Sequence, residues 1–133
     1  MRKAMIVAMA LGSAALGGCG EGGAPTNQHT AIKVRGPDQD RLHQLDAFNL
    51  AIALKHAIHD AGYTCQRVTG GGFVAQYENL DMWTATCDDK REWAVFAGPD
   101  GSAQVRDCKD VAASGLPACT VSRAPKGSFT DPA

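Results

Sequence analysis

The sequence predicts one small α+β domain, in which a single N-terminal helix packs on an antiparallel sheet of three to five strands. Three observations predict this fold. An amphipathic helical pattern runs from Leu42 or Asp46 to Ala61 and stops at a glycine. Short β-prone runs separated by turn residues follow it. Besides Cys19, four cysteines lie within or after those runs, which is enough for two disulfides.

The predicted helix is apolar along one face, as expected for packing on a sheet. Asp46 is placed to cap its N-terminus, and Gly62 to adopt a left-handed conformation after its last turn. Phe48 and Ile52 lie four residues apart on the opposite face. They either meet the preceding segment or the following loop, or remain as an exposed apolar stripe, a candidate binding feature. The apolar face consists of Ala47, Leu50, Ala51, Ala53, Leu54, Ala57, Ile58 and Ala61.

The second half of the chain predicts a meander of short strands. The clearest turn is at residues 98–101, because its proline presets φ and its second glycine accepts a positive φ. Trp83 and Trp93 then lie on neighbouring strands as core residues and can pair across them. Residues 73–77 are either a further strand or an ordered part of a long loop. The other strands are expected at residues 63–68, 82–88, 92–97 and 103–108.

The cysteines predict how the strands are linked. If the first two predicted strands pair antiparallel, Cys65 lies beside Cys87, and Cys108 is left to bond Cys119. If residues 73–77 instead form a full central strand between those two, the first pairing fails. A zinc site is disfavoured, because no two of these cysteines have the short spacing of a structural zinc site.

The remaining segments predict how the domain is attached. Residues 41–123 form the folded unit. Residues 19–40, rich in glycine, proline and polar residues, are typical of a flexible tether. Residues 124–133 have a similar composition without periodicity and are expected to be a disordered tail. Residues 1–18 have the order of an export signal, with Arg2 and Lys3 before an apolar run that is shorter than the ~20 residues of a membrane-spanning helix.

Residues 16–19, Leu-Gly-Gly-Cys, resemble the lipobox of bacterial lipoproteins. The resemblance implies that signal peptidase II cuts before Cys19 and that Cys19 carries lipid, including palmitate, which anchors the chain to a membrane of the cell envelope. An aspartate directly after the cysteine would resemble an inner-membrane retention signal, but this chain has Gly20 at that position. The resemblance therefore favours the periplasmic face of the outer membrane.

Charge and motifs argue against several function classes. The formal net charge is -1, and it becomes -3 without residues 1–18, which hold two basic residues and no acidic ones. This mild acidity disfavours nucleic acid as a ligand. The chain lacks the common hydrolase, zinc-protease and nucleotide-binding motifs, and the run Gly70-Gly71-Gly72 lacks the lysine that a phosphate loop needs. We therefore expect no catalytic residue and no cofactor.

His56 and His59 lie three residues apart on the polar face of the predicted helix, with Asp60 beside them. A surface metal site is geometrically possible there. Solvated histidines are the favoured interpretation, because no carboxylate is fixed beside both rings. The sequence therefore predicts no metal site.

Two wider resemblances bear on function. The order of the helix, Ala61-Gly62-Tyr63, the short strands and Pro99-Asp100-Gly101 resembles the PepSY-type layout of secreted bacterial modules, some of which restrain peptidases. Tyr63-Thr64-Cys65, followed by Phe73, Val74 and Tyr77-Glu78-Asn79, is similar to the opening of the envelope lysozyme-inhibitor lipoproteins, which are β-barrels. The sequence predicts a non-catalytic envelope lipoprotein that binds an envelope protein or another envelope component. A small envelope enzyme, or an inhibitor of lysozyme or a peptidase, is the alternative.

Overall fold

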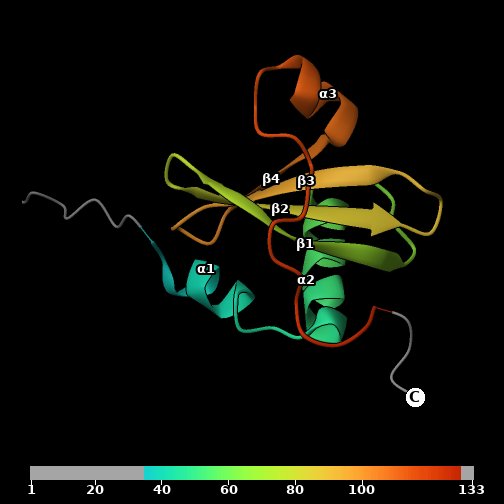
Figure 1. The fold of residues 1–133 in the computed structure, drawn as a ribbon, viewed down its shortest axis with the longest axis horizontal. Helices are drawn as coiled ribbons and strands as arrows, with labels where there is room; N and C mark the ends of the chain where they lie inside the picture. The colour runs from blue at the N-terminus through green and yellow to red at the C-terminus, as the bar shows by residue number, and fades with distance from the viewer. Residues whose placement is uncertain (1–34, 130–133) are drawn as a thin grey trace, which may run out of the picture. The chain divides into compact units, whose positions relative to one another are not determined.

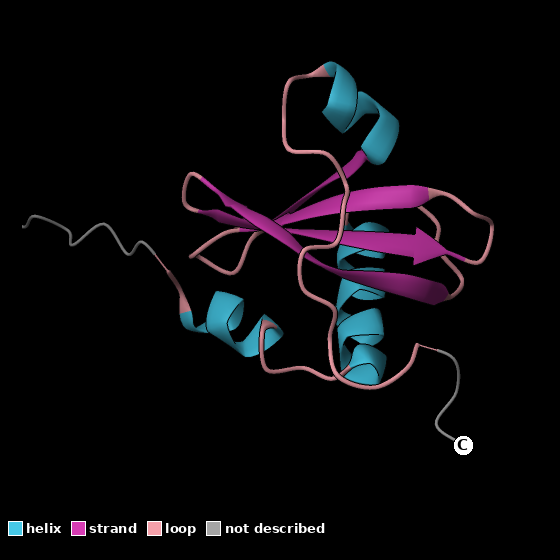
Figure 2. Cartoon of the chain, in the orientation of Figure 1, coloured by secondary structure: helices cyan, strands magenta, loops and turns pink. Residues whose placement is uncertain are grey.

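The computed structural model describes residues 35–129. The predicted signal peptide, Cys19 and most of the predicted tether lie outside the described residues. The described chain is an α+β fold in which helices accompany a four-stranded antiparallel sheet (Figures 1 and 2). Among residues 35–129, no helix is long and apolar enough to cross a membrane.

The expectation of a single N-terminal helix is wrong, because three helices are present in the described chain: α1 (Pro37–Leu42), α2 (Ala47–Asp60) and α3 (Cys108–Ala113). The predicted helix is α2, and the Asp46 carboxylate accepts a 2.8 Å hydrogen bond from the Asn49 amide, as a cap should. Helix α1 lies partly within the predicted tether. Six residues are too few to show a helical period, so composition alone suggested a coil.

Tertiary contacts hold α1 in place. Pro37 presets the backbone at its first position. Gln39 is fully buried, and its side chain accepts a hydrogen bond from the Gly36 amide and donates to the carbonyls of Asn79 and Ala97. Every polar atom of the buried amide is therefore used, which fixes α1 against the sheet.

The sheet confirms the predicted antiparallel meander, with some strand limits shifted. The strands are β1 (Val68–Tyr77), β2 (Leu80–Cys87), β3 (Glu92–Ala97) and β4 (Ala103–Asp107), in that spatial order. The predicted strand at 63–68 is wrong, and residues 73–77 are the second half of β1. The last predicted strand ends at Asp107, because its carboxylate caps Lys109 and starts α3 at Cys108.

The glycine run explains the error in β1. Glycine has low β propensity, so the sequence suggested a loop. In the structure, a Cβ atom on Gly71 would lie 2.3 Å from the Thr84 carbonyl oxygen of β2, and one on Gly72 would lie 2.8 Å from the Arg123 carbonyl oxygen. The run therefore lets neighbouring backbones approach β1 closely.

Each face of the sheet has its own core. Leu50, Leu54 and Ile58 of α2 pack on one face, and α3 covers part of the other (Figure 1). Trp83 and Trp93 are each 3% exposed and belong to the core under α2, as predicted. The expected direct pair is wrong in detail, since Trp83 faces Val95 and Trp93 faces Ala85. The two indoles are therefore diagonal neighbours.

The two predicted disulfides are present. Cys65 is bonded to Cys87 with a Cα–Cα distance of 5.7 Å, and Cys108 to Cys119 with 5.9 Å. The first bond forms although Cys65 precedes β1, because Val68 at the start of β1 pairs with Cys87 at the end of β2. The predicted pairing is correct although its basis, a strand at residues 63–68, is not, because the segment just before β1 lies beside the end of β2.

Residues 119–129, which we call the C-terminal strap, cross the sheet face away from α2 and continue past β1 (Figure 1). Arg123 forms a β-bridge with Phe73, and the Lys126 carbonyl accepts a 2.7 Å hydrogen bond from the Ala47 amide at the start of α2. Phe129 packs against the core under α2. Residues 124–129 therefore differ from the predicted disordered tail, because contacts with the rest of the fold hold them in place. Composition does not reveal these contacts. Residues 130–133 lie outside the described part.

Candidate binding groove

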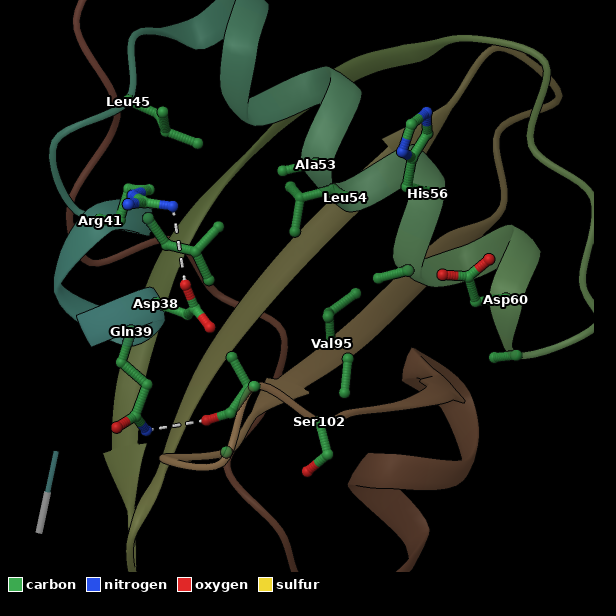
Figure 3. A pocket seen from close by; sticks show the side chains of 17 residues that line it. Asp38, Gln39, Arg41, Leu45, Ala53, Leu54, His56, Asp60, Val95 and Ser102 are labelled. Carbon is green, nitrogen blue, oxygen red and sulfur yellow. Dashed lines mark hydrogen bonds and ion pairs between the residues drawn. The ribbon is translucent and has the colours of Figure 1, made fainter. Parts of the chain in front are cut away.

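A groove of about 440 Å³ lies between α1, α2 and the β3–β4 hairpin, and we call it the α2 groove (Figure 3). Leu54, Val95 and Ala97, all buried core residues, form its floor. Its volume falls in the range of about 300 to 1,000 Å³ that is typical of ligand sites. The floor offers apolar surface to a bound group.

Small residues keep the groove open. Ala53 and Ala57 lie one turn apart on the α2 wall, and Gly101 and Ala103 form part of the opposite wall. Longer side chains at these positions would meet across the space. The sequence predicts that the alanine-rich face of α2 packs on the sheet. Its buried residues do so, and its small, partly exposed residues leave a hollow beside them.

Charged and polar side chains surround the apolar floor. Figure 3 shows Asp38 and Arg41 of α1 on one side of the groove and His56 and Asp60 of α2 on the other. Arg41 and Asp38 form an ion pair at 3.8 Å, and Ser102 donates a 2.6 Å hydrogen bond to Asp100, which lowers the pKa of that carboxyl group. Asp38 and Arg41 pair with each other, and the charged groups lie on opposite sides of the groove rather than converging on one point. The arrangement favours recognition over proton transfer.

The two helix histidines do not act together. His56 lines the α2 groove, whereas the His59 Nε2 atom lies 3.2 Å from the Cys65 carbonyl oxygen. Among the residues that the structure describes, no group of three or more histidine, cysteine, aspartate or glutamate side chains is placed to hold a metal ion. The metal hypothesis for His56 and His59 therefore gains no support.

The predicted stripe of Phe48 and Ile52 faces solvent, with exposures of 51% and 42%. Both residues line a shallow hollow of about 210 Å³ with Lys55 and Phe129. The stripe is exposed, and it lies beside the loop that follows α2, at Gln66 and Arg67, and beside the end of the C-terminal strap. The stripe and the α2 groove are separate features of α2.

Sequence reasoning missed a polar cluster around Asp81, which is fully buried in β2. Arg35 donates to both carboxylate oxygens, at 3.1 and 3.0 Å, and His43 Nε2 lies 2.7 Å from one of them. Hydrogen bonds to Asp40 and Asp81 raise the pKa of Arg35. The partners are 46 and 38 positions away in the chain, so no local motif revealed them.

The second ring nitrogen of His43 is also occupied, because Arg123 of the C-terminal strap donates to His43 Nδ1. Arginine only donates, so Nδ1 must be the acceptor and Nε2 must carry the proton that Asp81 accepts. The His43 ring packs against Phe73 and Trp83, at centroid distances of 4.7 and 4.8 Å. With both nitrogens engaged, this His–Asp pair joins α1, β2 and the C-terminal strap and does not present a free base.

No protein family, curated protein or solved structure matches the chain. Cys19, the predicted lipid-attachment residue, lies outside the described residues.

Proposed function

We propose that the chain is a cell-envelope lipoprotein, anchored through lipid on Cys19, whose disulfide-linked domain is a non-catalytic binding module for an envelope protein. The α2 groove carries this proposal, because its apolar floor is bordered by exposed charged side chains. An apolar centre with a polar border is the usual anatomy of a protein-binding surface.

The proposed address rests on the lipobox-like residues 16–19 and on the two disulfides. Disulfides persist in oxidising compartments such as the periplasm. Gly20 supports the periplasmic face of the outer membrane. Labelled palmitate should enter the wild-type chain, and Cys19→Ala should abolish incorporation; equal labelling of both would refute the anchor.

Site-specific photocrosslinking in intact cells tests the binding surface. A photoreactive residue would replace His56 in the α2 groove, Ile52 in the exposed stripe, or Lys109 on α3. We expect a defined crosslinked protein from the position of His56 and none from that of Lys109, which provides the matched background.

Two other results would contradict the proposal in different ways. A product from Ile52 alone would move the binding surface to the apolar stripe and refute the groove. Identical products from all three positions, or no product from any of them, would refute the proposed binding module.

A further inference from the structure

The two edges of the sheet differ. At the β1 edge, the C-terminal strap exchanges hydrogen bonds with Phe73 through Ser122 and Arg123. Within residues 35–129, no segment pairs with the outer edge of β4. An open strand edge presents unpaired amide and carbonyl groups to another chain.

The β3–β4 hairpin sets which backbone groups of β4 face outward. The Gly98 amide donates to the Ser102 carbonyl at 2.8 Å, and Phe96 then faces Gln104 while Ala94 faces Arg106. Because hydrogen-bonded pairs alternate with non-hydrogen-bonded pairs in an antiparallel ladder, Gln104 and Arg106 use their backbone groups on β3. The amides and carbonyls of the alternate residues, Ala103 and Val105, point to the open edge.

The same alternate residues line two hollows on the α2 side of the sheet. Ala103 lines the α2 groove, and Val105 lines a second hollow of about 550 Å³. Two residues along a strand span about 6.8 Å. Alternate side chains of an added strand have the same repeat as Ala103 and Val105, so successive ones would lie beside the two hollows.

The second hollow has an aromatic wall. Tyr63 is 42% exposed and stacks on Trp93 with a centroid distance of 4.5 Å, and the Arg91 guanidinium lies 5.2 Å from the Trp93 ring centroid. At the other end, the Asp60 carboxylate lines the α2 groove without a hydrogen-bond or ion-pair partner among the described residues. Arg106, Asp107 and Asp110 also line the second hollow, so within it the Tyr63–Trp93 wall is the part that favours an apolar side chain. The α2 groove favours a basic side chain near Asp60.

We propose that β4 binds an extended segment of a partner protein as a fifth strand. The inference rests on the proposed binding function and names its mode. The partner strand pairs with the outward amides and carbonyls of Ala103 and Val105. Its alternate side chains enter the two hollows, with an apolar residue against Tyr63 and a basic residue near Asp60. Backbone pairing supplies affinity, and the hollows select the side chains.

The test uses a phage-displayed library of short random peptides, selected on the purified chain in mild detergent. Ala103→Pro removes the outward amide, and proline is tolerated on an edge strand where its missing N–H would face outward. Ala103→Val adds a side chain of similar bulk and keeps the amide, so it is the matched control. We expect selected peptides to bind the proline variant about tenfold or more weakly than the valine variant, as loss of an edge hydrogen bond predicts.

Amide hydrogen exchange on the wild-type chain gives a readout that needs no variant. Bound peptide should newly protect Ala103 and Val105, whereas Gln104 and Arg106 should change little. Peptides that bind without protecting Ala103 and Val105 would overturn strand addition while leaving the proposed binding module intact. Equal binding to both variants would also overturn it. A concentration-dependent dimer abolished by Ala103→Pro would identify a second copy of the chain as the occupant and refute a partner strand, and failure to select any peptide would count against both proposals.

Discussion

Asp81 shows how a single residue can depend on partners far along the chain. Its carboxylate is 0% exposed and bonded to Arg35 and His43, whereas Asp40, which also binds Arg35, has a side chain that is 58% exposed. A buried carboxylate needs its partners because water cannot replace them, while an exposed ion pair contributes little. The two aspartates on one arginine therefore form a matched comparison.

We predict that Asp81→Asn lowers the free energy of unfolding by about 3 kcal/mol, because Arg35 and His43 lose a charged acceptor inside the protein. Asp40→Asn should change it by less than about 0.5 kcal/mol. Urea unfolding followed by tryptophan fluorescence would measure both changes. Equal effects of the two substitutions would show that the buried cluster does not stabilise the fold.

His43 provides a second prediction at this scale. Donation from Arg123 to Nδ1 requires the neutral tautomer with hydrogen on Nε2. Nitrogen-15 NMR of the imidazole at neutral pH should show this tautomer in the wild-type chain, and Arg123→Ala should permit a mixture of tautomers. A dominant Nδ1–H form in the wild type would contradict the cluster geometry.

Residue-level prediction from sequence succeeded where the chemistry is intrinsic to a residue and failed where it depends on distant partners. The cysteines were paired correctly because strand adjacency limits disulfide geometry. Arg35 falls within the predicted tether, and Arg123 is the last residue of the predicted folded unit. Nothing local distinguishes them from solvated arginines, although they lie at two ends of one hydrogen-bonded chain.

At the scale of elements, β1 depends on a glycine run that sequence rules interpret as a loop. Gly71 has φ of 152° and lies where a Cβ atom would clash with the Thr84 carbonyl. Gly62, after α2, has φ of 88° with open space around it. A side chain at Gly62 would meet only the unfavourable φ, whereas one at Gly71 would also meet a steric clash. Comparing substitutions at the two positions therefore separates these two costs.

We predict that Gly71→Ala destabilises the protein by at least about 2 kcal/mol, because the β1 and β2 backbones must move apart. Gly62→Ala should cost about 1 kcal/mol, from the positive φ alone. Thermal and urea unfolding of both variants would measure the difference. A smaller effect for Gly71→Ala would mean that β1 can shift away from β2 without loss.

The elements that were predicted well have strong local signals. Helix α2 has a long apolar period and an N-cap, and the turn at residues 98–101 has both proline and glycine, with Gly101 at φ of 81°. Helix α1 and the ordered part of the C-terminal strap have no apolar period of that length. Each is fixed by contacts formed only after folding, namely the buried Gln39 side chain and the Lys126 carbonyl.

At the scale of the whole molecule, the two disulfides have different tasks. Cys65 and Cys87 are both buried in the core under α2 and are 22 residues apart. Cys108 and Cys119 are 11 residues apart and join α3 to the C-terminal strap. The α2 groove was not predictable from the sequence, because it forms where α1, α2 and the β3–β4 hairpin leave space between small residues.

We predict that removing the disulfides one at a time separates global from local stability. Cys65→Ala/Cys87→Ala should lower the free energy of unfolding by about 3 kcal/mol or more. The loop that this disulfide closes is twice as long as the loop closed by Cys108 and Cys119, which alone adds about 0.6 kcal/mol. The substitutions also remove side-chain volume from the core. Cys108→Ala/Cys119→Ala should cost less and loosen the C-terminal strap. In that variant, hydrogen exchange should accelerate at the amides of Ala47 and Phe73, which donate to strap residues, and at the Ser122 amide, which lies in the strap. The amides between β2 and β3 should remain protected. If both double variants accelerated the same amides to the same extent, the strap would have to be part of a single cooperative unit with the sheet.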